Sequence, residues 1–480
     1  MSWTDFVTIE DLVQAIKNQQ LTVKSIIEQV FEQIEQTRSF QVLLTDFKKE
    51  AFEQANLIDN KIRLQQPLGR LAGVPFIVKD NFLTFNQTTT AASHMLENFV
   101  APYQATSVTK LINEDAILIG KANLDAYAHG SSTENSDFFT TKNPYDKNRV
   151  PGGSSGGSAA AIALNIVPFA LGTDTGGSIR LPASFCNQVG FKPSYGLVSR
   201  SGVVAMASSL DCIGPITRNV KDASLILDII AGQDQLDSTT ISRDQVGYVV
   251  VNSSDRKITR KAKIGVISDY LIDGIDQKVK NNFLNKVELL KKAGFQVEDV
   301  TVPLIKYALG VYYIICPAEI SSNLSRYDGL RYGYHQINVN DFETSIEMSR
   351  SNGFGREAKR RIMIGTYVLS SGYYDAYYKK AQQVRTKLID NFKKLFKTYD
   401  FLIGPTVPIL PFKIGEKNSD PIAMYLTDVM TVSANLVGIP AISLPAGMID
   451  GLPTGFQVMA DSQVDKKLLA FSAEIEELIK

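Results

Sequence analysis

The chain has 480 residues, and its 50 lysines and arginines balance 50 aspartates and glutamates. At roughly 150 residues per domain this length allows about three domains, although a large sheet-based enzyme can hold such a chain in one unit. A hydrophobic fraction of 44% excludes a disordered or fibrous protein, and a net charge of zero argues against a chain whose main task is to bind phosphate backbones, because that affinity comes from unopposed lysines and arginines.

The N-terminal segment carries helical patterns and no targeting signal. The first residues, MSWTDFVTIEDLV, show no basic stretch followed by an apolar one, and the chain has no uncharged apolar run of about 18 residues. Thr8 and Asp11 match a capping box, and the apolar residues from Ile26 to Ile34 recur on one helix face. We therefore expect a cytoplasmic protein without membrane spans, in which residues 1–70 form a helical region.

Short apolar runs alternate with helix-like segments over the rest of the chain. The runs span residues 74–78, 116–119, 167–171, 264–267, 401–403 and 441–444. Strands that alternate with helices predict an α/β fold. We expect one domain over residues 1–480, in which a central mixed β-sheet is flanked by helical layers.

Composition divides this domain into parts. After the helical region we expect a catalytic core at 71–232, a surface excursion at 233–258 and a C-terminal part at 259–480 that completes the sheet and the substrate pocket. The excursion is polar and rich in serine and threonine, and a domain boundary there is the less favoured alternative. Residues 354–399, rich in tyrosine and lysine, predict long helices that cover the sheet.

Two stretches rich in glycine and serine lie at the start of predicted helices. The first, RVPGGSSGGSAAA at 149–161, runs into an alanine-rich helix start, and the second, LGTDTGGSIR at 171–180, follows an apolar strand. Backbone N–H groups at such junctions favour a developing anion. Because the two stretches are close together in the chain, we expect Ser154 and Ser178 to share one site.

Other interpretations of these stretches are open at this point. Residues 152–156 match G-x-S-x-G, the nucleophile elbow of α/β-hydrolases, but that elbow follows a strand and needs a later histidine, and only His335 follows, in a helix-like context. A phosphate-binding loop needs the motif G-x-x-x-x-G-K-[ST], which is absent from the sequence. The plainest alternative is a pair of flexible connections.

A serine nucleophile needs a base, and the candidates are few. Of the three histidines only His129 lies near a glycine-rich stretch, and its Ala-Tyr-Ala context suggests a packed or site-lining ring. Lys79 ends the apolar run GVPFIVKD, which places its amine at the carboxyl edge of a buried strand, where α/β sheets bind ligands. Burial can keep such a lysine neutral so that it accepts a proton. The alternative is an edge lysine paired with Asp80.

The cysteines Cys186, Cys212 and Cys316 are odd in number and form no C-x-x-C motif. Neither a disulfide framework nor a zinc site is indicated, and a reducing compartment is the natural environment for such a chain. We expect no bound metal in this chain.

Lys79, GGSSGGS at 152–158 and GTDTGGSIR at 172–180 together resemble the amidase signature family, whose Ser-cisSer-Lys triad hydrolyses amides. Within that family the chain is similar to the glutaminase subunits of amidotransferases that act on Glu-tRNA(Gln), and the likeness extends over nearly the whole length. Segments that carry it include GSSTEN at 130–135, NPYD at 143–146, KRRIMIGT at 359–366 and SSGYYDAYYKKA at 370–381. The resemblance implies a single amidase signature domain.

The resemblance also implies a role for each residue that matches the family motifs. Ser178 is the expected nucleophile, Ser154 a bridging serine preceded by a cis peptide bond, and Lys79 the base. The N–H groups of the oxyanion hole are expected from Thr175, Gly176 and Gly177.

A free glutamine carries a carboxylate and an ammonium, so its pocket needs a fixed cation and a fixed anion. By position, Arg361 and Asp428 resemble the family's ligands, and Arg360 is the near rival of Arg361. For each of these residues a surface charge is the alternative. The substrate-binding residues that the resemblance implies are Gly130, Ser131, Tyr312, Arg361 and Asp428.

The chain departs from the family pattern beside this pocket. The related subunits usually read DEFAMG where this chain has DAYAHG at 125–130, which removes a carboxylate and adds the imidazole of His129. The Cys-Gly pair that commonly follows the nucleophile helix is Cys186-Asn187 here, and we expect Cys186 to be buried packing.

The activity implied by the resemblance is a glutaminase that frees ammonia for the ATP-dependent conversion of Glu-tRNA(Gln) to Gln-tRNA(Gln) in a heterotrimer. No cofactor is expected in this chain, because ATP and Mg²⁺ are expected on the partner B subunit, which also holds most of the Glu-tRNA(Gln), while the small C subunit joins the two. The zero net charge fits this division of labour. The alternatives are a free-standing amidase that acts on small amides and a catalytically silent assembly scaffold.

Overall fold

The computed structural model describes every residue of the chain except 245–246, 251–261, 272–273, 338, 340 and 418–419. The described residues form one mixed sheet of 11 strands in the order β1-β3-β2-β4-β6-β5-β10-β11-β9-β7-β8. The strands are β1 (Leu43–Asp46), β2 (Pro75–Lys79), β3 (Ile117–Ala122), β4 (Phe169–Asp174), β5 (Val189–Lys192), β6 (Cys212–Thr217), β7 (Lys263–Ile267), β8 (Gln296–Val300), β9 (Phe401–Pro405), β10 (Ala441–Ile449) and β11 (Leu452–Met459). The predicted α/β class with a central mixed sheet is confirmed.

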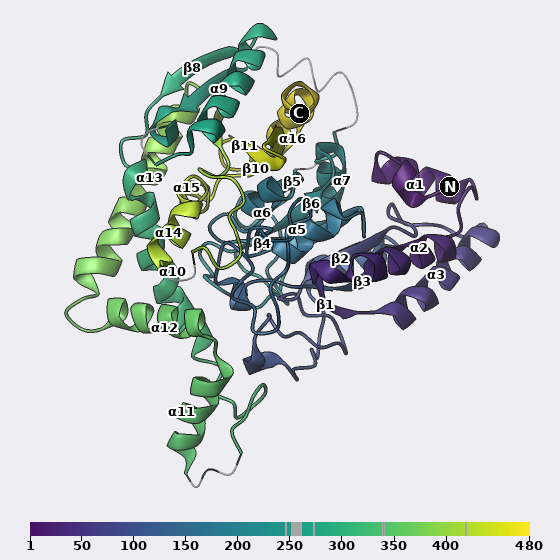
Figure 1. The fold of residues 1–480 in the computed structure, drawn as a ribbon, viewed down its shortest axis with the longest axis horizontal. Coiled ribbons are helices and arrows are strands. Elements are labelled where there is room, and N and C mark those ends of the chain that lie inside the picture. The colour runs from purple at the N-terminus through teal and green to yellow at the C-terminus, as the bar shows by residue number, and fades with distance from the viewer. Residues whose placement is uncertain (245–246, 251–261, 272–273, 338, 340, 418–419) are drawn as a thin grey trace.

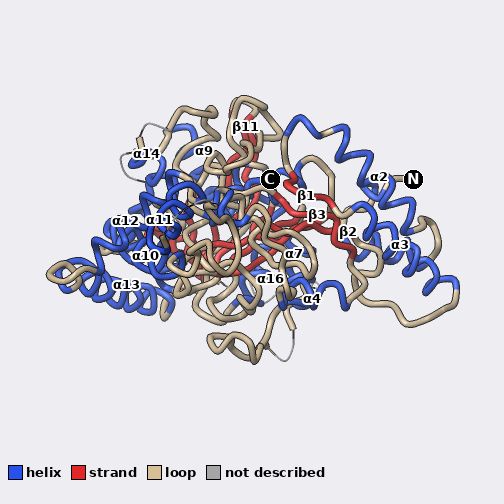
Figure 2. Tube along the Cα trace, turned by 90° about the horizontal axis from the view of Figure 1, so that it is seen from below, coloured by secondary structure: helices blue, strands red, loops and turns tan. Residues whose placement is uncertain are grey.

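Helices surround this sheet (Figure 1). They are α1 (Ile9–Lys17), α2 (Val23–Gln36), α3 (Lys48–Arg63), α4 (Thr106–Asn113), α5 (Gly156–Ala163), α6 (Arg180–Phe185), α7 (Val220–Ile230), α9 (Gln277–Lys292), α10 (Ala308–Leu324), α11 (Phe342–Gly353), α12 (Arg356–Leu369), α13 (Lys380–Phe396), α14 (Pro421–Tyr425), α15 (Val432–Val437) and α16 (Asp465–Ile479). Figure 2 shows the strands running through the middle of the molecule, with α2 and α3 at one end and α10, α12 and α13 at the other.

The pairing of the strands explains which of them the sequence pattern predicts. β3, β2 and β4 run parallel to one another, as do β9, β7 and β8, while the strands between these two blocks pair antiparallel. In β2 the apolar run is continuous because both faces are covered, with Phe76 and Val78 in one core cluster and Ile77 in another. All six predicted runs fall on strands. Five strands were not predicted: β1, β5, β6, β8 and β11. Of these, β6 and β11 contain both proline and glycine, residues that usually mark the end of a strand.

The predicted N-terminal capping box is present. The Thr8 hydroxyl accepts a hydrogen bond from the N–H of Asp11 at 3.1 Å, and the Asp11 carboxylate accepts one from the N–H of Thr8 at 3.3 Å. The start of the predicted surface excursion is held against the core, since Asp237 forms an ion pair with Arg200 at 2.9 Å. Residues 245–246 and 251–258 of that excursion lie outside the described residues.

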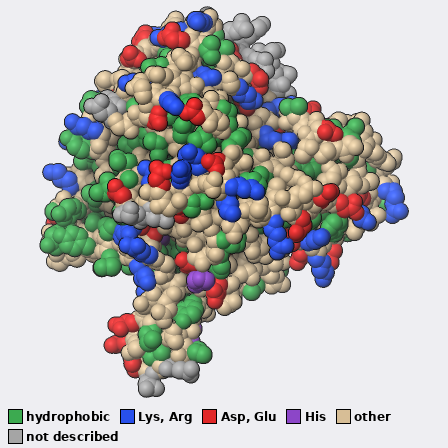
Figure 3. All heavy atoms as spheres, viewed as in Figure 1, with side chains coloured by type: hydrophobic (Ala, Val, Ile, Leu, Met, Phe, Trp, Pro, Cys, Tyr) green, Lys and Arg blue, Asp and Glu red, His purple; other side chains and the backbone are tan. Residues whose placement is uncertain are grey.

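The surface carries both signs of charge. Acidic and basic side chains are interspersed over the face drawn in Figure 3, as the zero net charge leads one to expect. Exposed apolar side chains gather at the C-terminal end of α12 and just beyond it, at the left edge of that view: Met363, Tyr367, Tyr373, Tyr374 and Tyr377. Among the described helices, none combines the length and the hydropathy needed to cross a lipid bilayer.

Helices α10 and α12 approach each other closely and carry two of the predicted substrate-binding residues, Tyr312 and Arg361. Gly365 of α12 lies against α10, because a Cβ atom built on it would be only 1.9 Å from the carbonyl oxygen of Pro317. A larger residue at this position would push the two helices apart and change the position of Arg361 relative to Tyr312.

We expect Gly365→Ala to destabilise the protein by about 1 to 3 kcal/mol through overpacking, although alanine by itself favours a helix over glycine by about 1 kcal/mol. The matched control is Gly310→Ala in α10, where a Cβ atom would meet nothing within 4 Å and the substitution should raise stability slightly. Urea unfolding of the three proteins tests this expectation. Equal shifts for the two variants would contradict it.

Candidate functional site

Lys79 is the last residue of β2 and is fully buried. Its Nζ atom lies 2.7 Å from Ser154 Oγ and 2.9 Å from Thr173 Oγ1. Asp80, the next residue, forms an ion pair with Lys121 at 2.8 Å instead. The alternative of an edge lysine paired with Asp80 is therefore wrong, and the lysine amine points at a serine.

The environment of Lys79 favours its neutral form. Burial lowers the pKa of this lysine to about 7, although the nearby carboxylates of Asp125, Asp174 and Asp211 oppose the shift. A large fraction of the amine is therefore neutral near pH 7. A neutral amine at 2.7 Å from the hydroxyl of Ser154 is positioned to accept its proton.

The two glycine-rich stretches meet, as the sequence predicts. Ser154 lies just before α5, and the peptide bond between Gly153 and Ser154 is cis. The N–H of Ser155 donates to the carbonyl oxygen of Ser178 at 3.1 Å, which joins the two stretches. No strand lies between Ala122 and α5, a stretch that is described throughout, so the nucleophile-elbow interpretation is wrong.

Asp125 packs against the first glycine-rich stretch. Its carboxylate accepts hydrogen bonds from the N–H groups of Thr133 at 2.9 Å and Asn135 at 3.0 Å. A Cβ atom on Gly130 or Gly153 would lie 2.4 or 2.2 Å from that carboxylate, so both positions need glycine. Burial raises the pKa of Asp125 to about 6, and near neutral pH its charge beside the stretch disfavours a bound phosphate.

Within the second stretch, residues 175–178 directly follow β4. No acceptor occurs in the described part of the chain for the backbone N–H groups of Thr175, Gly176 and Gly177. Gly177 has φ = +141°, and a Cβ atom there would meet the Thr431 hydroxyl at 2.3 Å, while one on Gly176 would meet the Tyr312 ring at 2.7 Å. Free N–H groups held beside Ser178 are the arrangement that an oxyanion hole needs.

A buried ion pair fixes the start of the helix that follows Ser178. Arg180 donates to both carboxylate oxygens of Asp174, at 2.9 and 3.0 Å, and Asp174 also accepts from the side chain of Asn435 at 2.9 Å. Burial alone would raise the pKa of Asp174, but the attraction of Arg180 outweighs it and lowers the pKa to about 2. Asp174 is therefore ionised at every pH at which the protein works, and it holds the loop that carries Ser178 in place.

Arg361 of α12 supplies a buried cation. It is 3% exposed, its Nε donates to Glu357 Oε1 at 2.9 Å, and its guanidinium carbon lies 5.7 and 5.8 Å from the ring centroids of Tyr313 and Tyr425. No hydrogen bond from its two terminal amino groups is found among the described residues. Arg360 also pairs with Glu357, but about a third of its side chain (31%) is exposed. The structure therefore brings Arg361, and not its rival, into the interior beside the other predicted residues.

Asp428 supplies the buried anion. Its Oδ2 accepts hydrogen bonds from Ser131 Oγ at 3.1 Å and from Tyr313 Oη at 3.2 Å. Burial raises the pKa of Asp428 to about 7, although Ser131, Arg361 and Tyr313 oppose the shift. A carboxyl group of this kind gains a strong partner when an ammonium group is placed beside it.

Several residues of the site are absent from the sequence-based prediction. The Thr173 hydroxyl accepts hydrogen bonds from Lys79 and Asn81. Thr431 packs on the second glycine-rich stretch, and Tyr313 contacts Asp428. Tyr312 is the predicted phenol, whereas the ring that touches Asp428 is that of Tyr313. Only the rotation of α10 about its axis decides which of two adjacent tyrosines faces the carboxylate.

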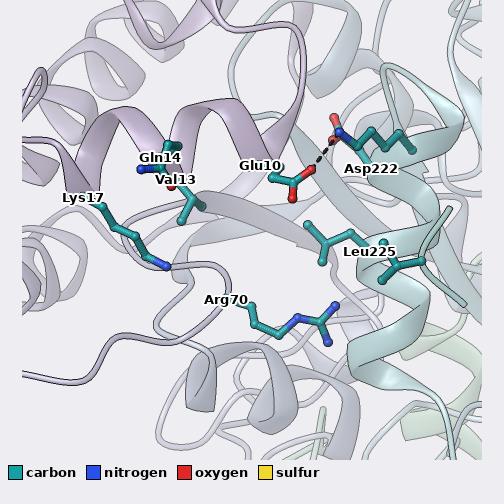
Figure 4. Close-up of a pocket in the computed structure, with 9 residues that line it drawn as sticks. Glu10, Val13, Gln14, Lys17, Arg70, Asp222 and Leu225 are labelled. Atoms are coloured by element: carbon teal, nitrogen blue, oxygen red, sulfur yellow. Dashed lines mark ion pairs between the residues drawn. The ribbon is translucent and has the colours of Figure 1, made fainter. Parts of the chain in front are cut away.

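A pocket lies away from these residues, between α1 and α7 (Figure 4). Two of its three cations are paired, because Lys221 binds Glu10 at 2.7 Å and Arg70 binds Asp228 at 2.7 Å, and the third is Lys17. None of the predicted site residues lines this pocket. The predicted site residues therefore lie elsewhere in the molecule.

Comparisons with known proteins show which family this chain resembles. A family model described as Amidase matches residues 25–469. The chain is 47% identical over 474 residues to the A subunit of glutamyl-tRNA(Gln) amidotransferase from Caldanaerobacter subterraneus subsp. tengcongensis, a match that covers 98% of this chain and 96% of that protein. It is also 47% identical over 472 residues to the protein of the same name from Staphylococcus epidermidis, with 98% and 97% covered.

Solved structures give the same result. A crystal structure of the A subunit of glutamyl-tRNA(Gln) amidotransferase from Thermotoga maritima matches with a TM-score of 0.80 and 39% identity, covering 98% of this chain and 94% of that one. A bacterial aryl acylamidase of the amidase signature family matches with a TM-score of 0.84 and 26% identity, covering 98% and 96%. With a family model that spans nearly the whole chain, and relatives that share almost half of its residues, this chain belongs to the amidase family.

Proposed function

We propose that this chain is the glutaminase subunit of a glutamyl-tRNA(Gln) amidotransferase, acting in the cytosol. The observation that carries the proposal is the buried contact of 2.7 Å between the Lys79 amine and the Ser154 hydroxyl. The next residue, Ser155, donates its N–H to the carbonyl oxygen of Ser178, so the two serines lie in neighbouring segments. Full-length relatives of that name, at 47% identity, support the same assignment.

The first half of the reaction forms an acyl-enzyme. Neutral Lys79 takes the proton of Ser154, Ser154 takes that of Ser178, and the Ser178 oxygen bonds to the carbon of the glutamine side-chain amide. The N–H groups of Thr175, Gly176 and Gly177 hold the negative oxygen, a contribution of about 3 to 4 kcal/mol for one donor in comparable sites. The C–N bond then breaks, and the proton held by Lys79 returns through Ser154 to the nitrogen that leaves as ammonia.

The second half releases glutamate. Water loses a proton to the same Ser154 and Lys79 pair and attacks the ester carbon, and the Ser178 oxygen leaves with that proton. The enzyme returns to its starting state, with one glutamine and one water converted to glutamate and ammonia.

The pocket suits the two charges of free glutamine. The terminal amino groups of Arg361 are positioned for the α-carboxylate, and Asp428, held by Ser131 and Tyr313, for the α-ammonium. Gly130 packs against Asp125 and Asn135, and the Tyr312 ring packs on Gly176 at the oxyanion loop.

We assign the remaining steps to partner subunits. ATP and Mg²⁺, which activate the glutamate of Glu-tRNA(Gln), are assigned to the B subunit together with most of the tRNA contacts, and the C subunit joins the two. The mixed surface charge of this chain and the carboxylate of Asp125 beside its glycine-rich stretch support placing nucleotide and RNA elsewhere. The exposed tyrosines beyond α12 are the kind of patch at which proteins associate.

A free-standing amidase is the second candidate, because a bacterial aryl acylamidase superposes equally well. An assay with and without the partner subunits separates the two. An amidotransferase subunit gains glutamine turnover when its partners are added, whereas a free-standing amidase shows unchanged glutamine turnover and hydrolyses simple amides rapidly.

Ser178→Ala is expected to reduce glutamine hydrolysis by about a thousandfold or more, because the acyl-enzyme cannot form. The matched control is Ser351→Ala, an exposed serine of α11 that should leave the activity unchanged. Ammonia release by the assembled complex is the measurement. Full activity in Ser178→Ala would exclude serine catalysis and favour the scaffold alternative.

The pH dependence reports two groups whose pKa values lie at about 7. Lys79 must lose its proton to act as a base, and Asp428 must lose its proton to hold the ammonium of glutamine. We expect log(kcat/KM) for glutamine to fall below pH 7 with a slope approaching 2. For glutaramate, which lacks the ammonium, the slope should approach 1. A rate that does not change between pH 6 and pH 8 would rule out Lys79 as the base.

Arg361→Lys is expected to raise KM for glutamine about 10- to 100-fold, because a lysine keeps the charge but loses the planar fork that binds a carboxylate. Arg360→Lys is the matched control on the same helix, and its KM should stay within about twofold because that side chain is partly exposed. Steady-state kinetics of both variants give the comparison, and the reverse order would assign the carboxylate to Arg360.

A further inference from the structure

His129 lies in the loop that also supplies Gly130 and Ser131 to the pocket. The side chain is 1% exposed, and neither of its ring nitrogens has a hydrogen-bond partner among the described residues. A buried polar group without a partner costs about 1 to 3 kcal/mol, so such groups are rare in folded proteins and call for an explanation.

The loop holds this imidazole in a fixed place. The Asn135 side chain donates to the His129 carbonyl oxygen at 2.9 Å, and Asp125 accepts from the N–H of the same Asn135 at 3.0 Å. Tyr127 and Ala128 both have positive φ values, of 54° and 64°, a conformation that residues other than glycine rarely adopt. Strain of this kind persists only where the surroundings over-determine it, which is typical of functional sites.

Aromatic packing closes one side of the ring. Tyr127 lies 6.0 Å from the His129 ring between centroids and itself packs on Tyr327 and Phe354 at 5.4 and 5.5 Å. These neighbours are fixed by the core and offer no partner to the two ring nitrogens. The imidazole therefore has little freedom to turn towards another group of the protein.

The charged neighbour of His129 is Arg361. Burial, and then the positive charge of Arg361, hold the pKa of His129 well below its usual value, so the ring is neutral. A neutral imidazole keeps one N–H donor and one acceptor nitrogen. A cation beside such a ring attracts an anion into the same space, and the N–H can donate to that anion.

We propose that His129 is a further substrate-positioning residue, whose ring N–H donates to the α-carboxylate that Arg361 binds. The inference rests on the proposed glutaminase function and adds a contact that an apolar side chain at this position cannot make. The buried imidazole, which has no partner among the described residues, gains one when the substrate binds.

The test separates this contact from a purely structural role. In the full chain, with its partner subunits where activity needs them, His129→Met should raise KM for glutamine about tenfold and leave kcat nearly unchanged. The second substrate is 4-aminobutanamide, which keeps the ammonium and the amide but lacks the carboxylate, and its kcat/KM should not change. His129→Asn, which keeps a side-chain N–H donor, should recover part of the loss. An equal loss with both substrates, or no loss with glutamine, overturns the proposal.

A binding measurement does not depend on turnover. The chain has only three histidines, so the ring ¹⁵N signals are few, and His129→Asn identifies one of them. In Ser178→Ala, glutamine should shift the His129 signal and leave those of His94 and His335 in place, whereas 4-aminobutanamide should shift none of the three. If glutamine binds without shifting His129, this inference fails alone. If glutamine does not bind and the wild-type complex does not hydrolyse it, the proposed function fails.

Discussion

The burial of one amine at the end of β2 is the constraint on which the rest of the site depends. A lysine cation without water or a counterion is costly, and a protein can lower that cost by pairing the charge or by leaving the amine neutral. Each nearby carboxylate has other partners: Asp125 binds backbone N–H groups, Asp174 binds Arg180, and Asp211 binds Thr175. Because none of them forms an ion pair with Lys79, the amine contacts the hydroxyls of Ser154 and Thr173 instead.

The same low-dielectric interior gives the other charged groups different states. Asp174, in a two-point contact with Arg180, stays ionised and acts as a fixed anchor for the loop before α6. Asp428 accepts hydrogen bonds only from hydroxyl groups among the described residues, and burial raises its pKa to about 7 although Arg361 opposes the shift. The two buried carboxylates therefore have different roles that depend on their partners: Asp174 stabilises the loop before α6, and Asp428 is available to bind a cation.

The sequence patterns correctly predicted those strands that a continuous run of apolar residues defines. The continuous apolar run before Lys79 identified β2, because both of its faces are buried. Patterning failed for β6 and β11, in which proline and glycine are tolerated because antiparallel neighbours hold the strands in register. It also failed for Thr431, whose contact with the carbonyl of Gly176 joins residues far apart in the chain.

By itself the sequence determined the chemical inventory: a strand that ends in Lys79, two glycine-rich stretches that carry serines, a scarcity of histidine and a balanced charge. These follow from local composition, and local composition is what a sequence displays directly. Only the tertiary structure decided which of Arg360 and Arg361 is buried and which tyrosine of α10 touches Asp428. Only the tertiary structure, likewise, shows that the ring nitrogens of His129 are buried without a hydrogen-bond partner among the described residues. The reason is physical: burial, and with it pKa and hydrogen-bond satisfaction, is set by the packing of distant segments, and neighbouring residues on a helix differ by about 100° in the direction they face.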